Sequence, residues 1–171
     1  ENFKIIYNDP RRFGYIKIFY NKKILNRFLD SYGEEPLDTN FNLIFFKKNI
    51  LKRDKNIKNI LLDQKIISGI GNIYANEILF NAKINPKNKG KNLNSKQLNN
   101  IYKSSKIILA RAIKFGGSSI RDFKNTNGSS GNFQNEFKVY NKSNEICPTK
   151  HCNNKIKKIT ISNRSTFYCQ K

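Results

Sequence analysis

The spacing of apolar positions changes twice along this chain. Residues 3–7 and 15–20 are rich in β-forming side chains, and the turn signal Asn8-Asp9-Pro10 separates them. From residue 137 onward apolar and polar positions alternate, which predicts a β-hairpin near the end of the chain. Between these parts, apolar residues recur at helical spacing in four segments, at 40–52, 57–64, 72–82 and 93–115. The sequence therefore predicts an α+β fold.

Two irregular segments divide the chain. Residues 25–39 contain Gly33, Pro36 and a small acidic cluster, which is typical of a solvated connection and not of paired catalytic carboxylates. Residues 116–135 form a long loop rich in Gly, Ser and Asn, which is either functional or a flexible linker. We therefore expect three domains, at 1–30, 40–135 and 136–171.

The ends of two predicted helices can be assigned from capping residues. Thr39 or Asn40 would cap the first long helix, Asn94 or Ser95 would cap the last, and Gly116-Gly117 would end the last. The inward face of the last helix would comprise Leu98, Ile101, Tyr102, Ile108, Leu109, Ala112 and Ile113.

A glycine-rich turn precedes the helix that starts at Asn72. Gly69 and Gly71 can adopt backbone angles closed to other residues, so the chain can turn tightly into a helix whose first N–H groups attract anions. Asn72 adds a side-chain donor. In a chain of net charge +21 the expected anion is a nucleic-acid phosphate. The alternative is a tight helix connection that binds no ligand.

The positive charge has two sources. Of the 33 basic residues 26 are Lys, in a chain also rich in Asn and Ile, and an AT-rich genome would produce that bias without selection for DNA binding. Arginine is more informative, since its planar guanidinium forks onto a phosphate or a base edge. Three of the seven arginines, Arg11, Arg12 and Arg164, become candidates because the stretches that contain them resemble a known family. No apolar run approaches the roughly eighteen residues that a membrane helix needs, so no membrane partner is expected.

Three cysteines, Cys147, Cys152 and Cys169, lie in the last 25 residues. An odd number of thiols without a secretory signal predicts a metal site in a reducing compartment instead of a disulfide framework. Three free thiols in a small β module are the alternative.

Three stretches of the chain resemble one known family, and they occur along the chain in the same order as in that family. GIGNIYANEILF is similar to the helix–two-turn–helix element of the formamidopyrimidine-DNA glycosylases, DPRRFG to their intercalation loop, and NRSTFYC to their zinc finger. The resemblance implies the remnant of an N-terminal β-sandwich, a helical domain with the helix–two-turn–helix, and a C-terminal β-hairpin zinc-finger-like module. It also implies base-excision repair by a DNA glycosylase and abasic-site lyase, which removes oxidised purines (8-oxoguanine, formamidopyrimidines) from duplex DNA.

The resemblance implies roles for two loops. Arg11 would contact the base opposite the damaged nucleotide, Arg12 a phosphate, and Phe13 would help to fill the gap left by the extruded nucleotide. The alternative is an ordinary basic turn whose Phe13 folds into the core. GGSSIRDF resembles the segment that closes over the extruded base, with Ser118, Ser119 and Arg121 as its candidate residues.

The resemblance also implies three contacts to the DNA backbone. Lys65 would lie close to it, although a solvated lysine is an equal alternative. Asn72 from the helical element and Arg164 from the zinc finger would hold neighbouring phosphates from two sides. Such phosphate contacts position a protein on DNA, while base contacts specify the sequence.

The cysteines match the family's zinc ribbon in part. Sixteen residues separate Cys152 from Cys169, as in the family's motif, which implies one zinc ion. The first pair departs from the motif, because four residues instead of two lie between Cys147 and Cys152. The motif's fourth cysteine would follow Lys171, and His151 is an awkward substitute beside Cys152.

The family's catalytic nucleophile has no match in this chain. It is the amine of an N-terminal proline followed by glutamate, whereas the chain begins with Glu1-Asn2-Phe3 and Pro10 is internal. We expect the whole protein to be the enzyme, a monomer of the bacterial or organellar cytoplasm. The alternatives are an endonuclease VIII-like glycosylase for oxidised pyrimidines and a non-catalytic ribosomal-type protein.

We expect the 171-residue polypeptide by itself to bind damaged duplex DNA without cutting it, because an amine nucleophile is needed to form the Schiff base. Borohydride reduction converts such an intermediate into a covalent adduct. With a duplex that contains 8-oxoguanine, trapping should give no adduct on this chain. A trapped complex would contradict the expectation.

Overall fold

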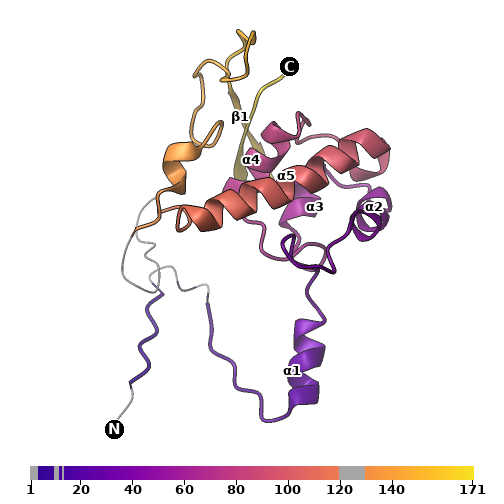
Figure 1. Cartoon of the computed structure of the whole chain (residues 1–171), viewed down its shortest axis with the longest axis vertical. Coiled ribbons are helices and arrows are strands. Elements are labelled where there is room, and N and C mark those ends of the chain that lie inside the picture. The colour runs from indigo at the N-terminus through magenta and orange to yellow at the C-terminus, as the bar shows by residue number, and fades with distance from the viewer. Residues whose placement is uncertain (1–3, 10–11, 13, 120–129) are drawn as a thin grey trace. The chain divides into compact units, whose positions relative to one another are not determined.

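The structure is a computed structural model, and it describes residues 4–9, 12, 14–119 and 130–171. The chain divides into two units, Glu1–Ser31 and Tyr32–Lys171, so the boundary lies inside the predicted connection. In chain order the elements are α1 (Lys22–Leu29), α2 (Leu43–Leu51), α3 (Ile57–Leu62), α4 (Asn72–Asn81), η1 (Gly90–Asn92), α5 (Ser95–Lys114), η2 (Phe133–Glu136), β1 (Lys157–Ile161) and β2 (Arg164–Tyr168). They are labelled in Figure 1 where space allows.

In the first unit the predicted strands are wrong for the residues that the structure describes. Residues 4–9 and 14–19 are extended but belong to no strand, and Ile5 and Ile18 are 91% and 70% exposed. Two short strands are at best marginally stable unless another element covers their apolar face. The described residues of this unit offer only α1 as such an element, and α1 has no buried residue.

Helix α1 is a second correction, since its later half falls in residues that were expected to be a connection. Asn21 is its N-cap, and the Asn21 side chain accepts a hydrogen bond from the Lys23 N–H. The rings of Phe19 and Phe28 lie 5.2 Å apart, with the Lys17 ammonium over both of them. A cap and an aromatic pair therefore stabilise a helix that the sequence pattern did not predict.

The second unit is built on α2 to α5, and α5 runs along the other helices (Figure 1). The larger of its two hydrophobic clusters is mostly aliphatic, and Phe41, Phe46, Ile60, Ile78 and Ile101 are among its completely buried members. All the helices in the described part of the chain are too short or too polar to span a lipid bilayer.

The caps of the long helices follow local hydrogen bonding. Asn94 caps α5 through a capping box with Gln97, which confirms one of the two predicted caps. The cap of α2 is Asn42 and not Thr39 or Asn40. The reason is that the Asp38 carboxylate already accepts the Asn40 N–H at 2.8 Å and holds a turn there.

The far end of α5 also matches the sequence, with one exception. Gly116 and Gly117 have φ values of 71° and 83°, which glycine adopts without strain, and the Gly117 N–H donates to the Ala112 carbonyl at 2.8 Å. They end the helix as predicted. Ile113 was expected to face inward but is 69% exposed.

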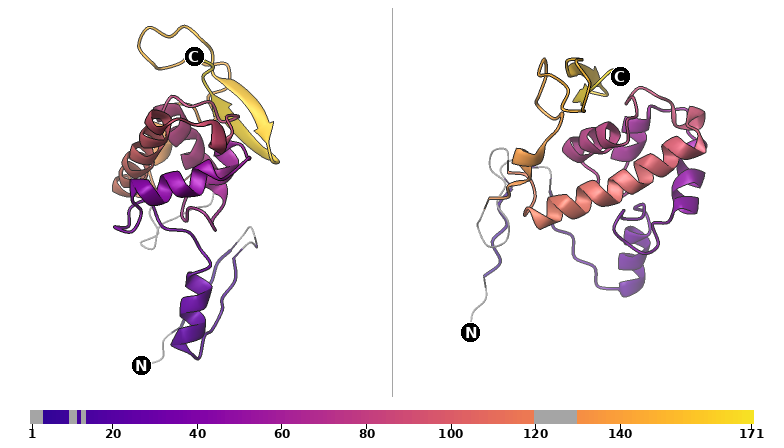
Figure 2. Two further views of the ribbon diagram at one scale, coloured as in Figure 1. Left: turned by 90° about the vertical axis from the view of Figure 1, so that its right-hand side faces the viewer. Right: turned by 45° about the horizontal axis from the view of Figure 1, so that its top comes forward.

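The C-terminal module contains the predicted hairpin (Figure 2). Strands β1 and β2 pair antiparallel, with Lys157 opposite Tyr168 and Ile161 opposite Arg164. The two turn residues, Ser162 and Asn163, have positive φ values of 47° and 58°. Positive φ at both central residues defines the type I′ turn, which suits the twist of a two-residue hairpin.

Three buried side chains of the helical part bond to this module, and we call Lys58, Asn76 and Glu77 the polar seam. The Lys58 ammonium donates to the Ser165 carbonyl at 3.0 Å and to the Thr166 hydroxyl at 2.6 Å. Lys58 is completely buried, and this burial, with the nearby charge of Arg164 as a smaller cause, lowers the pKa of Lys58 to about 8.

The other two seam residues bond to the module's backbone. The Asn76 side-chain oxygen accepts the Phe167 N–H at 2.6 Å. The Glu77 carboxylate, 2% exposed, accepts three consecutive backbone N–H groups at 2.9–3.0 Å, those of Lys138, Val139 and Tyr140. The seam thus fixes the module to α3 and α4.

The lowered pKa of Lys58 predicts a pH dependence of stability. Between pH 8 and about 10.4, the ordinary lysine value, the unfolded chain holds this proton more than the folded chain does, so the contribution of Lys58 to stability rises with pH. The free energy of unfolding of the native chain minus that of Lys58→Met should therefore increase from pH 7 to pH 10. Urea unfolding at each pH measures it.

The control for this measurement is Lys103→Met, which removes an exposed lysine of α5. Tyrosine and cysteine titrations are common to all three proteins and cancel in the differences. A Lys58→Met difference that does not change over this pH range would show that the Lys58 ammonium is not destabilised by its burial.

Candidate nucleic-acid interface

The glycine-rich turn between α3 and α4 is stabilised by one side chain. The Gln64 amide nitrogen donates to the Ile70 carbonyl at 3.0 Å, and the Gln64 oxygen accepts the Gly69 N–H at 2.9 Å. Gly69 has φ 83°, which requires glycine for an unstrained turn. The Gly69 N–H is therefore used inside the turn, which leaves the N-terminus of α4 and Asn72 as the candidate anion-binding groups of this region. The sequence analysis missed Gln64.

Asn72 is the first residue of α4, and it lies against the hairpin. Its side-chain nitrogen donates to the Ser165 carbonyl at 3.1 Å. An amide nitrogen carries two hydrogens, and the Ser165 carbonyl accepts a hydrogen bond from one of them. The Asn72 side-chain oxygen is buried and has no hydrogen-bond partner among the described residues. Asn72 is thus held at the junction of the helix and the hairpin.

Arg164 is exposed and directly precedes Ser165 in strand β2. The turn before it is fixed to α3, because the Asn59 side chain donates to the Ser162 hydroxyl at 2.9 Å. The peptide after it is fixed by two donors, Asn72 and Lys58, on the Ser165 carbonyl. Asn72 and Arg164, two of the predicted residues, lie 92 positions apart in the sequence. The structure brings them together, because Asn72 bonds to Ser165, the neighbour of Arg164.

Lys58 was not singled out from the sequence. A single lysine in a helix that otherwise carries Ile57, Ile60 and Leu61 is expected to project into solvent. Its partners lie 107 and 108 positions away along the chain, so no local pattern could have identified them.

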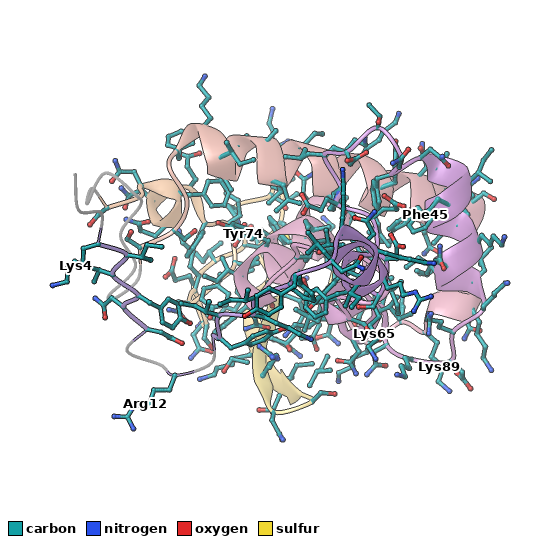
Figure 3. The ribbon with its side chains drawn as sticks, turned by 90° about the horizontal axis from the view of Figure 1, so that it is seen from below. Lys4, Arg12, Phe45, Lys65, Tyr74 and Lys89 are labelled. Atoms are coloured by element: carbon teal, nitrogen blue, oxygen red, sulfur yellow. The ribbon has the colours of Figure 1, made fainter. Side chains whose placement is uncertain are left out.

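Lys65, which was predicted to lie close to the DNA backbone, is exposed in the turn between α3 and α4 (Figure 3).

Two of the predicted base-closing residues, Ser118 and Ser119, lie beside a pocket of the second unit. The pocket has a volume of about 420 Å³, and Glu35, Tyr74, Leu109 and Gly117 are among its lining residues (Tyr74 is labelled in Figure 3). The chain continues from Gly117 directly into Ser118 and Ser119. The first predicted residues of the loop therefore start at the rim of a mainly apolar cavity.

The segment that returns from the loop holds Ser119 through two hydrogen bonds and pairs with Ser118 through an isolated β-bridge between Ser118 and Asn132. The Ser119 N–H donates to the Gln134 side chain at 3.0 Å, and the Ser119 hydroxyl accepts the Gly131 N–H at 2.8 Å. The Ser118 hydroxyl is buried and finds no hydrogen-bond partner in the described part of the chain. Arg121 lies outside the described residues.

The predicted intercalation loop belongs to the first unit. The Asp9 carboxylate accepts the Gly14 N–H at 2.6 Å, and the Arg12 N–H donates to the Asp9 carbonyl at 3.1 Å. Arg12 is exposed and has φ 56°. The bonds to Asp9 hold Arg12 in a tight turn, from which the Arg12 side chain projects (Figure 3). Arg11 and Phe13 lie outside the described residues.

The three cysteines meet in the C-terminal module. Their sulfur atoms all lie within 4.8 Å of one another, and those of Cys152 and Cys169 are 3.7 Å apart. Zinc–sulfur bonds of about 2.3 Å in a tetrahedron place two sulfurs about 3.8 Å apart, so the arrangement fits a zinc ion. His151 is exposed and does not belong to the group.

The thiols differ in their surroundings. Burial raises the pKa of the Cys169 thiol. Burial acts in the same direction on Cys147, but hydrogen bonds from Thr149, Cys169 and Cys152 together outweigh it and lower the pKa of that thiol. A lowered pKa favours the thiolate, which is the form that binds metals.

A comparison with protein families identifies the helical part. The model of the formamidopyrimidine-DNA glycosylase H2TH domain, the helix–two-turn–helix domain, matches residues 32–124. The match spans α2 to α5 and the turn that Gln64 stabilises.

Curated relatives are similar along almost the whole chain. The formamidopyrimidine-DNA glycosylase of Zymomonas mobilis is 42% identical over 169 residues, which cover 98% of this chain and 62% of the relative. That of a Wolbachia strain from Drosophila simulans is 41% identical, over 99% of this chain and 61% of the relative. The chain thus spans about three fifths of the length of these relatives.

Solved structures of similar proteins have the same fold. The MutM (Fpg) protein of Thermus thermophilus superposes with a TM-score of 0.82 at 31% identity, covering 94% of this chain and 61% of that one. The Fpg of Lactococcus lactis in complex with DNA that contains an abasic site gives 0.77 at 38% identity, covering 87% and 56%. With the family model matching more than half of its residues, this chain belongs to the formamidopyrimidine-DNA glycosylase (Fpg/MutM) family.

Proposed function

We propose that this chain is the DNA-binding part of a base-excision repair enzyme, a glycosylase and abasic-site lyase that removes oxidised purines from duplex DNA. The observation that carries the proposal is the hydrogen bond from Asn72 to the Ser165 carbonyl, which sets Asn72 beside Arg164. The relatives' names, and the lesion-containing DNA bound to the Lactococcus lactis structures, agree with it.

In the proposed complex, Arg164 and Asn72 hold neighbouring phosphates of the damaged strand. The guanidinium supplies a forked, permanently charged donor, and the N-terminus of α4 adds its positive dipole end. Lys65 adds a further charge on the same turn. These groups bind a phosphate without reading sequence, which suits an enzyme that must find a lesion in any sequence.

The extruded nucleotide needs a pocket and a closing segment. The cavity between Tyr74, Leu109 and Gly117 lies next to Ser118 and Ser119, whose loop we propose closes over the base. Arg11 would contact the base opposite the damaged nucleotide, Arg12 a backbone phosphate, and Phe13 would help to fill the gap. Removal of the base itself needs an amine nucleophile, so it is proposed for the whole protein.

Zinc is the metal that we propose for the thiol cluster. Cys147, Cys152 and Cys169 would supply three of the four ligands that a structural zinc ion takes, so the site is incomplete among the described residues of this chain. The role of the ion would be structural, because it would tie the chain before β1 to the chain after β2. The bound ion would stiffen the module that carries Arg164.

The family assignment bears on the alternatives. It argues against a ribosomal-type RNA-binding protein, because the match is to a DNA glycosylase domain. The endonuclease VIII-like alternative has no observation in its favour here, since the relatives carry the purine-lesion name.

The phosphate clamp predicts a salt-dependent loss of binding. Arg164→Ala should weaken binding to a duplex with an abasic-site analogue by about tenfold and reduce the slope of log K against log salt by about 0.9, the value for one phosphate contact. Arg164→Lys should recover the slope but not all the affinity, because lysine lacks the fork. Fluorescence anisotropy at several salt concentrations gives both.

Arg53→Ala is the matched control, since Arg53 lies between α2 and α3 and bonds to the Asn49 carbonyl. It should change the affinity by less than twofold. If Arg164→Ala behaves as Arg53→Ala does, the clamp is wrong and the proposed function loses its main support.

The zinc proposal predicts one ion per chain in protein purified under reducing conditions. Cys152→Ser should remove the ion and lower the melting temperature, because the module's small core depends on the cross-link. Thr149→Val, which keeps all three thiols, should retain the metal. Elemental analysis and thermal unfolding with and without a chelator measure both effects, and metal-free, chelator-insensitive native protein would refute the proposal.

A further inference from the structure

Asn76 joins the start of α4 to the strand that carries Arg164. Its side chain is 1% exposed and uses both of its functional ends. The nitrogen donates to the Asn72 carbonyl at 2.6 Å, and the oxygen accepts the Phe167 N–H at 2.6 Å. Asn72 and Asn76 are one helical turn apart and lie on the same face of α4.

Strand β2 is bound by β1 on one edge and by side chains of the helical part on the other. Those side chains contact three consecutive residues: Asn72 and Lys58 bind Ser165, Lys58 binds Thr166, and Asn76 binds Phe167. Of these contacts, the one from Asn76 is the farthest from the turn. At about 3.3 Å per residue it lies about 10 Å along the strand from Arg164.

Two separated attachment points fix the direction of a strand, whereas one point lets it pivot. Lys58 and Asn72 hold the Ser165 end, and Asn76 holds the Phe167 end.

Asn59 and Glu77 hold the module elsewhere, at Ser162 and at residues 138–140. Among the described hydrogen bonds from helical side chains, only that of Asn76 holds β2 beyond Thr166, so its loss would let β2 change direction about its Ser165 end and move the Arg164 guanidinium relative to Asn72. The distance between the two phosphate-binding groups would then no longer be fixed.

We propose that Asn76 is a positioning residue for DNA binding, which acts through Arg164 by fixing β2 against the first turn of α4. The inference rests on the proposed DNA-binding function. An amide suits this role because it offers one donor for the Asn72 carbonyl and one acceptor for the Phe167 N–H, whereas ionised aspartate lacks the donor and alanine offers neither group.

The test is a double-mutant cycle with the full 171-residue chain and a duplex that contains an abasic-site analogue. Asn76→Ala should weaken binding about fivefold to tenfold and lower the salt slope by up to about 0.9, because the Arg164 contact is misplaced. In the Arg164→Ala background the same substitution should have almost no effect. A loss that is equal in both backgrounds would overturn the proposal.

Asn81→Ala is the matched control, because Asn81 lies on the same helix but donates to Ser104 of α5 at 2.9 Å. It should leave the salt slope unchanged. Circular dichroism shows whether each variant is folded at the assay temperature. If Arg164→Ala alone does not affect binding, the proposed function fails; if it does and Asn76 shows no coupling, only the positioning role fails.

A second measurement needs no substitution at Asn76. Hydrogen exchange of the Phe167 amide reports the strength of its bond to Asn76. Addition of the duplex should slow that exchange in the native chain, because a held Arg164 stiffens β2, and should not slow it in Arg164→Ala. Equal effects in the two proteins would contradict the coupling even if Asn76→Ala does not fold.

Discussion

Burying a charged or amide side chain is costly unless its polar atoms find partners, and this constraint determines where the C-terminal module lies. Lys58, Asn76 and Glu77 are almost completely inaccessible, and their partners are groups of the module. If the module shifted, several buried donors and acceptors would lose their partners together. Apolar packing tolerates small displacements, but a set of directional bonds specifies one arrangement.

The helices and the hairpin of the second unit could be predicted from the sequence because their signals are local. The capping box at Asn94 and the paired glycines after α5 each act within a few residues. The polar seam could not be predicted in this way. A lysine and a glutamate on helices that bear apolar residues are normally assigned to solvent, and only the fold brings the distant partners to them.

The candidate site likewise combines residues that could be predicted from the sequence with contacts that could not. Asn72 was predicted from the glycine-rich turn before α4 and Arg164 through resemblance, whereas the hydrogen bond from Asn72 to Ser165, the neighbour of Arg164, is a property of the three-dimensional structure. In the first unit the error is a prediction of strands that the described residues do not form. Its residues 4–9 and 14–19 have a strand-like composition, but β-propensity reflects fit to a half-buried sheet, and the described residues provide no such surface.

The bonds of Glu77 have an evolutionary consequence. Many small zinc-binding domains are self-sufficient and can be exchanged between proteins, because their own core and metal supply all their stability. Here the backbone amides of 138–140 depend on a carboxylate of helix α4. The C-terminal module is therefore not a portable unit: recombination that separated it from α4 would leave both halves with unsatisfied groups, so the two should be inherited together.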